Sequence, residues 1–148
     1  LGFAVGNADA VGALGTLKTN IDSGQFTAIQ AAGVAALTGP QEPVRERVAT
    51  WEARRNMVVT GLREAGLDVP MPRATFYLWV PVPAGYTSVS FAAHLLEHAG
   101  VAVAPGVGYG ERGSGYIRIS LTTSDDRFAE AIGRIRERLG VATPPTVR

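Results

Sequence analysis

The sequence contains no cysteine, only one lysine and no long uninterrupted apolar segment. Without cysteine, neither a disulfide framework nor thiolate chemistry is possible. The 14 basic residues nearly balance the 13 acidic ones, so the composition does not favour binding to nucleic acid or to an anionic membrane. The apolar N-terminus lacks basic residues and is interrupted by Asn7 and Asp9, so we expect neither a signal peptide nor a membrane span there. These features are compatible with a cytoplasmic protein.

A chain of 148 residues is long enough to form a domain with its own hydrophobic core. Apolar residues at spacings of three and four predict several helices, and runs rich in β-branched and aromatic residues predict strands. The predicted helices are 10–17, 25–37, 42–65, 91–99 and 125–139, and the predicted strands or extended segments are 1–6, 67–69, 75–82, 101–104 and 116–121. From residue 67 onward, this order predicts an α/β fold: a small α+β domain with three or four strands and helices on one face.

The segment at 105–121 combines a glycine-rich loop with a strand that carries one arginine. Side chains alternate across a strand, so Ile117 and Ile119 are expected on one face and Arg118 on the other. A rigidly held guanidinium can bind a carboxylate or phosphate through two parallel hydrogen bonds. The alternation alone fits a surface ion pair at least as well, so both roles remain open at this point.

Three other features suggest chemistry but have simpler explanations. The glycines at 106–110 precede a strand, whereas a dinucleotide-binding loop opens a helix, so nucleotide binding is not expected. His94 and His98 flank Glu97 in a pattern found in some zinc peptidases, but a solvated helix face explains them better, and we predict no metal site. Lys18 is expected at a helix end beside a polar loop, which indicates a structural role.

Four segments together resemble the C-terminal part of a fold-type I, class I/II pyridoxal-phosphate aminotransferase, near the diaminopimelate and aspartate branch. They are L-G-F-A-V-G-N at 1–7, N-I-D-S-G-Q-F-T-A-I-Q-A-A at 20–32, A-T-F-Y-L-W at 74–79, and P-G-V-G-Y-G-E-R-G-S-G-Y-I-R-I-S-L at 105–121. Each segment alone is weak, but their order and spacing are specific. The resemblance covers about residues 1–140.

The resemblance implies a domain organisation for the whole chain. It assigns 1–24, with the strand at 1–6, to a remnant of the large cofactor-binding domain. It assigns 25–66 to long interdomain helices, 67–140 to the small C-terminal domain and 141–148 to a tail.

The resemblance also implies site residues. Arg118 corresponds to the arginine that binds the substrate α-carboxylate, and Phe76 and Tyr77 correspond to residues near the substrate. Asn20, Ser23 and Gly24 correspond to a segment that approaches the active site of the other subunit in a homodimer. The Schiff-base lysine is expected upstream of Leu1, so this chain is expected to contain no catalytic residue and to be inactive alone.

The implied activity is transfer of an amino group between an amino acid and a 2-oxo acid, with pyridoxal 5'-phosphate as cofactor. The substrate would be diaminopimelate or succinyl-diaminopimelate, in lysine biosynthesis. A non-catalytic module that binds small carboxylates or a protein partner is the alternative, because the chain lacks a suitable lysine nucleophile.

Overall fold

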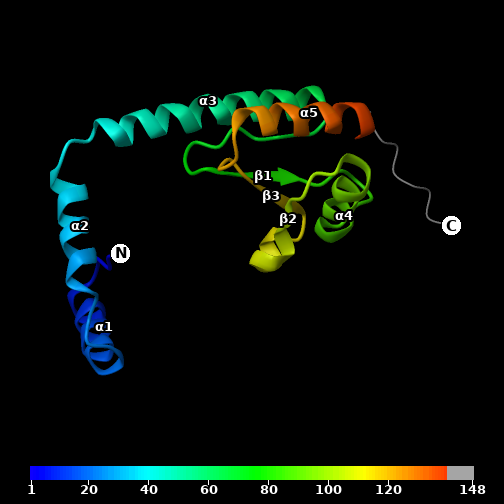
Figure 1. Ribbon diagram of the computed structural model, residues 1–148. Helices are drawn as coiled ribbons and strands as arrows, with labels where there is room; N and C mark the ends of the chain where they lie inside the picture. The colour runs from blue at the N-terminus through cyan, green and yellow to red at the C-terminus, as the bar shows by residue number, and fades with distance from the viewer. Residues whose placement is uncertain (140–148) are drawn as a thin grey trace. The chain divides into compact units, whose positions relative to one another are not determined.

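The computed structural model describes residues 1–139, which divide into two compact units. Unit 1 is Leu1–Arg45, and unit 2 begins at Glu46. Figure 1 shows the order of the elements along the chain. The tail expected at 141–148 lies outside the described residues. Within residues 1–139, no helix has both the length and the apolar character needed to cross a membrane.

Unit 1 contains α1 (Ala8–Ile21), α2 (Thr27–Thr38) and the first residues of α3 (Glu42–Glu64), which continues into unit 2. Asn7 caps α1, since its side chain accepts hydrogen bonds from the backbone N–H groups of Asp9 and Ala10. The break between α2 and α3 contains Pro40, which cannot continue the ladder of helical hydrogen bonds. No residue of α1 or α2 is buried, and Phe3 and Phe26 are about three-quarters exposed.

The strand predicted at 1–6 does not form, which corrects the sequence-based expectation. Residues 1–5 have no regular secondary structure, and their side chains are exposed. A strand needs a neighbouring strand to receive its backbone hydrogen bonds. The strands of residues 1–139 all lie in the three-stranded sheet of unit 2, so no strand in the described part of the chain pairs with residues 1–6.

Unit 2 is built around a three-stranded antiparallel sheet with the order β1–β3–β2, which is visible below α3 and α5 in Figure 1. The elements that follow α3 are β1 (Tyr77–Pro81), α4 (Ser88–Ala99), β2 (Ala104–Pro105), the 3₁₀ helices η1 (Gly106–Tyr109) and η2 (Glu111–Gly113), β3 (Tyr116–Ser120) and α5 (Asp125–Leu139). The expected extended segment at 67–69 is not a strand, although Leu67 and Val69 are buried.

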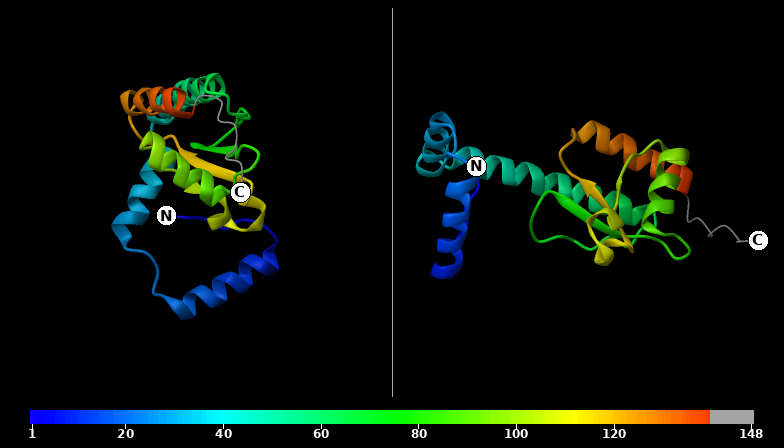
Figure 2. Two further views of the ribbon diagram at one scale, coloured as in Figure 1. Left: turned by 90° about the vertical axis from the view of Figure 1, so that its right-hand side faces the viewer. Right: turned by 90° about the horizontal axis from the view of Figure 1, so that it is seen from below.

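One face of the sheet forms the core of unit 2. Leu78, Val80 and Ile117 are completely buried there, together with apolar residues of α3, α4 and α5. Helices α3 and α5 run side by side, as both views of Figure 2 show, and their close approach occurs at Gly61, where an added Cβ would lie 2.6 Å from Ile132 Cγ2. The predicted small sheet with helices on one face is therefore confirmed.

Helix α4 has well-defined ends that position the loop after it. Thr87 and Ser90 form a reciprocal capping box, in which Thr87 Oγ1 accepts from the Ser90 N–H and Ser90 Oγ accepts from the Thr87 N–H. Gly100 ends the helix in the left-handed region, with φ of 64°, which glycine adopts without steric cost. The chain then enters β2 and the glycine-rich loop.

Candidate functional site

Arg118 lies in the middle of the central strand β3, on the face of the sheet opposite the core. Its neighbour Ile117 is completely buried, so the predicted alternation is confirmed. Trp79 of β1 is directly opposite Arg118 in the antiparallel register. The arginine is therefore held on a rigid element, and its side chain is half-buried.

Two tyrosine rings flank the Arg118 guanidinium. Its Cζ atom lies 4.0 Å from the ring centroid of Tyr77 and 4.2 Å from that of Tyr109. Both distances are within the range of cation–π attraction, which acts between the cation and the face of the ring. Tyr77 belongs to β1, on one side of β3, and Tyr109 belongs to η1, which follows β2 on the other side.

Arg118 is not part of an ion pair within residues 1–139, where no carboxylate oxygen lies within 4.0 Å of its guanidinium nitrogens. The interpretation of this residue as a surface ion pair is therefore wrong for the described part of the chain. Contacts with ring faces leave the N–H donors of a planar guanidinium free to point along its edge. Arg118 can consequently receive a carboxylate from outside the unit.

The glycine-rich loop brings Tyr109 to Arg118. Gly106 and Gly113 pack backbone against backbone, since an added Cβ at Gly106 would lie 2.2 Å from the carbonyl oxygen of Gly113. The buried Ser88 at the start of α4 anchors the loop, because its backbone N–H donates to the Ser114 carbonyl and its hydroxyl accepts from the Val107 N–H. The structure adds Tyr109 to the candidate residues. An aromatic residue placed between glycines before the strand is the only trace of it in the sequence.

Trp79 extends the aromatic surface beside Arg118. Its ring makes edge contacts with Tyr109 and Tyr116, at centroid distances of 5.5 and 6.3 Å. These three aromatic residues line a shallow hollow of about 280 Å³ together with Arg112 and Gly113. The face of the sheet that carries Arg118 is therefore aromatic and partly open.

A larger cleft of about 590 Å³ runs along α5 and the edge of β3 and also reaches Arg118. The hydroxyls of Ser120 and Thr122, both on its wall, lie 2.9 Å apart and bond to each other. On the α5 side, Glu130 forms ion pairs with both Arg127 and Arg134, so each of those arginines has a carboxylate partner. Arg118 is the arginine of this cleft that keeps its charge unpaired within the described residues.

Phe76 and Tyr77 were expected together near the substrate, and the structure directs them to different neighbours. The Phe76 ring lies 5.2 Å from Trp51 of α3, and Phe76 packs against the core. Tyr77 contacts Arg118. The rings of the two residues remain adjacent, with centroids 4.6 Å apart.

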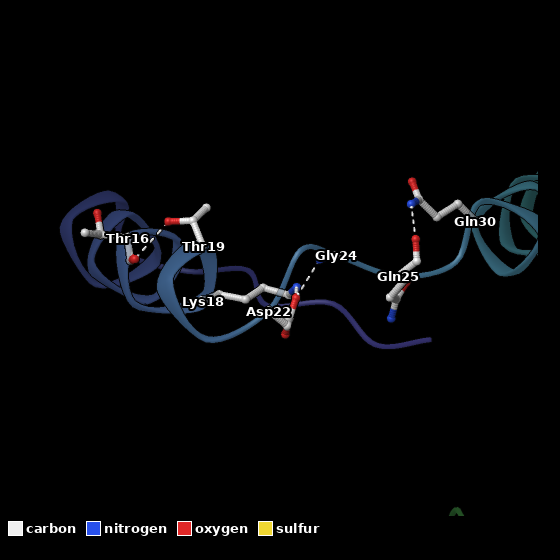
Figure 3. Close-up of polar contacts among 7 residues, drawn as sticks. All are labelled: Thr16, Lys18, Thr19, Asp22, Gly24, Gln25 and Gln30. Carbon is white, nitrogen blue, oxygen red and sulfur yellow. Dashed lines mark hydrogen bonds and ion pairs between the residues drawn. The ribbon is translucent and has the colours of Figure 1, made fainter.

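Asn20, Ser23 and Gly24 lie in unit 1, at the end of α1 and in the turn that follows. Figure 3 shows that Asp22 organises this turn. Its Oδ1 atom accepts from Lys18 Nζ at 2.6 Å and from the Gly24 N–H at 2.8 Å. Asn20 Nδ2 donates to the Thr16 carbonyl at 2.8 Å, which ties this side chain to α1. The turn is therefore preformed around Asp22.

Two hydrogen bonds hold the pKa of Asp22 below its ordinary value of 3.8. The bond from Lys18 has the larger effect, and the bond from the Gly24 N–H has the next largest. Lys18 itself is half-exposed and lies in the last turn of α1, where a cation interacts favourably with the helix dipole. A lysine that forms a covalent bond with a carbonyl cofactor needs a desolvated site that favours its neutral form. Lys18 does not fit that role, which agrees with its interpretation as structural.

His94 and His98 stack on α4, with ring centroids 4.1 Å apart. Burial lowers the pKa of His94 below its ordinary value of 6.5, and the neighbouring His98 lowers it further. A zinc site needs at least a third protein ligand. In the part of the chain that the structure describes, no three His, Asp or Glu side chains are grouped so that they could hold a metal ion.

The family model for aminotransferase class I and II matches residues 1–135. The chain is 54% identical over 140 residues to an LL-diaminopimelate aminotransferase from Moorella thermoacetica, a match that covers 95% of this chain and 36% of that protein. The chain thus spans about a third of the length of the curated relatives that it matches.

Solved structures give the same result. A probable N-succinyldiaminopimelate aminotransferase from Thermus thermophilus matches with a TM-score of 0.78 and 38% identity, over 90% of this chain and 36% of that one. An aminotransferase from Staphylococcus aureus matches with a TM-score of 0.83 and 34% identity, over 90% of this chain and 35% of that one. This chain belongs to the class I and II aminotransferase family.

Proposed function

We propose that the complete enzyme transfers an amino group between an amino acid and a 2-oxo acid, and that Arg118 binds the α-carboxylate of both substrates. The observation that carries the proposal is a charged guanidinium that two aromatic rings hold on a rigid strand without a carboxylate partner in residues 1–139. Such a group is matched to a planar anion with two oxygens.

Class I and II aminotransferases depend on pyridoxal phosphate, which, when bound, supplies the electron sink for reaction at the substrate Cα. The described residues do not fit a complete site for this cofactor, because the only lysine is exposed and paired with Asp22. We therefore propose that the cofactor-binding lysine belongs to a part of the enzyme that this chain does not span. The contribution of this chain is to bind and orient the substrate.

Arg118 would act by orientation. Two parallel hydrogen bonds from the guanidinium fix a carboxylate in position and direction, and this restricts the rotation of the attached Cα. A compound that lacks the carboxylate would leave the half-buried guanidinium unpaired, so binding also discriminates between substrates. Tyr77 supports the arginine, and Phe76 supports Tyr77 from the core side.

We further propose that the chain is the C-terminal portion of its enzyme. In this organisation, residues 1–24 belong to the large domain, 25–66 connect the domains and 67–140 form the small domain. The enzyme would be a cytoplasmic homodimer, in which the turn at Asn20, Ser23 and Gly24 approaches the active site of the partner subunit. The preformed turn around Asp22 is compatible with a fixed role of this kind.

The substrate we propose is diaminopimelate or its N-succinyl derivative. The support comes from the names of relatives, which include LL-diaminopimelate aminotransferases and a probable N-succinyldiaminopimelate aminotransferase. Both compounds are amino acids with an α-carboxylate, so both present the group that Arg118 would bind.

The test is the variant Arg118→Lys in the complete enzyme, with Arg45→Lys as control, because Arg45 is an exposed arginine of α3 paired with Glu42. Lysine keeps the charge but cannot form two parallel hydrogen bonds. We expect the KM for the amino acid to rise by about 10- to 100-fold in Arg118→Lys, as for loss of a hydrogen bond to a charged group, and to stay unchanged in Arg45→Lys. An unchanged KM in Arg118→Lys, with the cofactor absorbance intact, would refute the assignment.

A further inference from the structure

We propose that Tyr109 is a positioning residue that, together with Tyr77, holds the Arg118 guanidinium in the orientation needed to receive a carboxylate. This inference rests on the proposed function and extends it to a residue that no sequence feature assigned. In this proposal, the function of the glycine-rich loop is to place the Tyr109 ring against the Arg118 guanidinium.

The first argument is the freedom of the arginine side chain. An arginine that leaves a strand has several rotatable bonds, and fixing them costs entropy when a ligand binds. The two rings, at 4.0 and 4.2 Å from Cζ, restrict this freedom before the ligand arrives. Because they contact the guanidinium through their faces, the donors along its edge remain available for a carboxylate.

The second argument is that Tyr109 is itself fixed, although it lies in a loop. The edge of the Trp79 ring system packs against it at a centroid distance of 5.5 Å, and Trp79 is directly opposite Arg118 in the sheet. The loop that carries Tyr109 is closed by the contact between Gly106 and Gly113. A ring that was free to swing away could not restrict the arginine.

The third argument is exposure. Tyr109 is 50% exposed, so burial in the core does not explain its position. Tyr116 has similar surroundings, since it is 38% exposed and also contacts Trp79, but its ring does not lie over Arg118. This pair of tyrosines offers a matched comparison between an aromatic residue that contacts the guanidinium and one that does not.

The kinetic test uses the complete holoenzyme and the variants Tyr109→Leu, Tyr109→Phe and Tyr116→Leu. Leucine keeps apolar bulk but removes the aromatic face, whereas phenylalanine keeps the face. We expect Tyr109→Leu to raise the KM for the amino acid by about 2- to 30-fold, the range that a lost cation–π contact allows, with kcat little changed. Tyr109→Phe and Tyr116→Leu should stay within about twofold of the wild type. Equal effects of the two leucine variants would overturn the proposal.

A second measurement does not depend on activity. The NMR signal of the Arg118 Nε–H group, in ¹⁵N-arginine-labelled enzyme, should be shifted upfield by the flanking rings. We expect this shift to decrease in Tyr109→Leu and to persist in Tyr109→Phe and Tyr116→Leu. A signal that does not respond to Tyr109→Leu would overturn the contact itself.

The two proposals fail in different ways. If Arg118→Lys leaves the KM unchanged, the function proposed for Arg118 is wrong, whatever the NMR signal shows. If Arg118→Lys raises the KM and Tyr109→Leu does not, the assignment of Arg118 stands and the positioning role of Tyr109 is wrong.

Discussion

Gly106 and Gly113 face each other so closely that neither has room for a side chain. An added Cβ at Gly106 would lie 2.2 Å from the Gly113 carbonyl oxygen, and one at Gly113 would lie 2.1 Å from the Gly106 carbonyl oxygen. The obstructing atoms belong to the backbone, so they cannot turn aside as a side chain could. This contact closes the loop that holds Tyr109.

We predict that Gly106→Ala and Gly113→Ala each lower the stability of unit 2 by about 1–3 kcal/mol, as overpacked sites do. Each variant should also raise the KM for the amino acid, because the loop carries Tyr109. The controls are Gly108→Ala and Gly115→Ala, since an added Cβ at these positions meets nothing within 4 Å. Denaturant unfolding followed by circular dichroism measures the difference. Loss of stability in the controls equal to that in the variants would contradict the explanation.

Arg54 joins α3 to the start of α5 and to the residue that follows β3. Its Nε donates to Asp125 Oδ1 at 2.5 Å, and its Nη1 donates to the Leu121 carbonyl at 2.8 Å. Only 14% of the Arg54 side chain is exposed, whereas Asp125 is 64% exposed, so solvent screens the ion pair and the bond to the carbonyl matters more.

We therefore predict that Arg54→Met lowers the free energy of unfolding by about 1–3 kcal/mol, because it leaves a partly buried carbonyl without its charged donor. Arg45→Met is the matched control on the same helix, where both partners of the ion pair are about two-thirds exposed. It should change stability by less than about 0.5 kcal/mol. Similar losses of stability in the two variants would show that the partly buried hydrogen bond from Arg54 to the Leu121 carbonyl does not stabilise the fold more than an exposed ion pair does.

The carboxylate of Asp22 gives a prediction about pH. Its pKa is held below 3.8 in the folded protein by Lys18 and by the Gly24 N–H. Because the pKa of Asp22 is lower in the folded protein, the ionised carboxylate stabilises the folded turn, and this stabilisation is complete at pH values above the pKa of the unfolded chain. The stabilisation is lost as the pH falls through the pKa of the folded protein. We expect the turn at 22–24 to persist at pH 5 and to loosen only below about pH 3.8.

An NMR titration of the Asp22 carboxyl carbon measures this pKa directly. In Lys18→Gln, the first cause of the shift is removed, so the pKa of Asp22 should move up toward 3.8 but remain below it, because the Gly24 N–H still donates. A titration curve that is identical with and without Lys18 would refute the role of the ion pair.

Much of unit 2 could be predicted because its elements follow local patterns. The alternation at 116–121 identified the buried face of β3, and helical spacing at 128, 132, 135 and 139 identified the buried face of α5. Thr87 and Ser90, whose hydroxyls are of the type that caps helices, form the cap of α4. In each case the residues that form the sequence pattern are the same residues that make the packing contacts or hydrogen bonds of the element.

The partners of Arg118 could not be predicted in the same way. Tyr109 is only nine residues from Arg118, but its ring reaches the guanidinium through a loop conformation that depends on the contact between Gly106 and Gly113. That contact is tertiary and leaves no periodic pattern. The apolar alternation at 1–6, by contrast, predicted a strand that does not form. A strand pattern cannot indicate whether a partner strand is present.

Thr75, just before β1, is the one residue other than glycine with a positive φ in residues 1–139, at 69°. This conformation is unfavourable for a β-branched residue, and the Thr75 hydroxyl stabilises it by accepting from the Tyr77 N–H at 3.2 Å. Tyr77, which donates this bond, is the first residue of β1. A shift of one residue would turn Phe76 toward Arg118 and place the Tyr77 phenol in the apolar core. Thr75 therefore lies at the position where the register of β1 begins, and that register determines which of two consecutive aromatic rings faces the arginine.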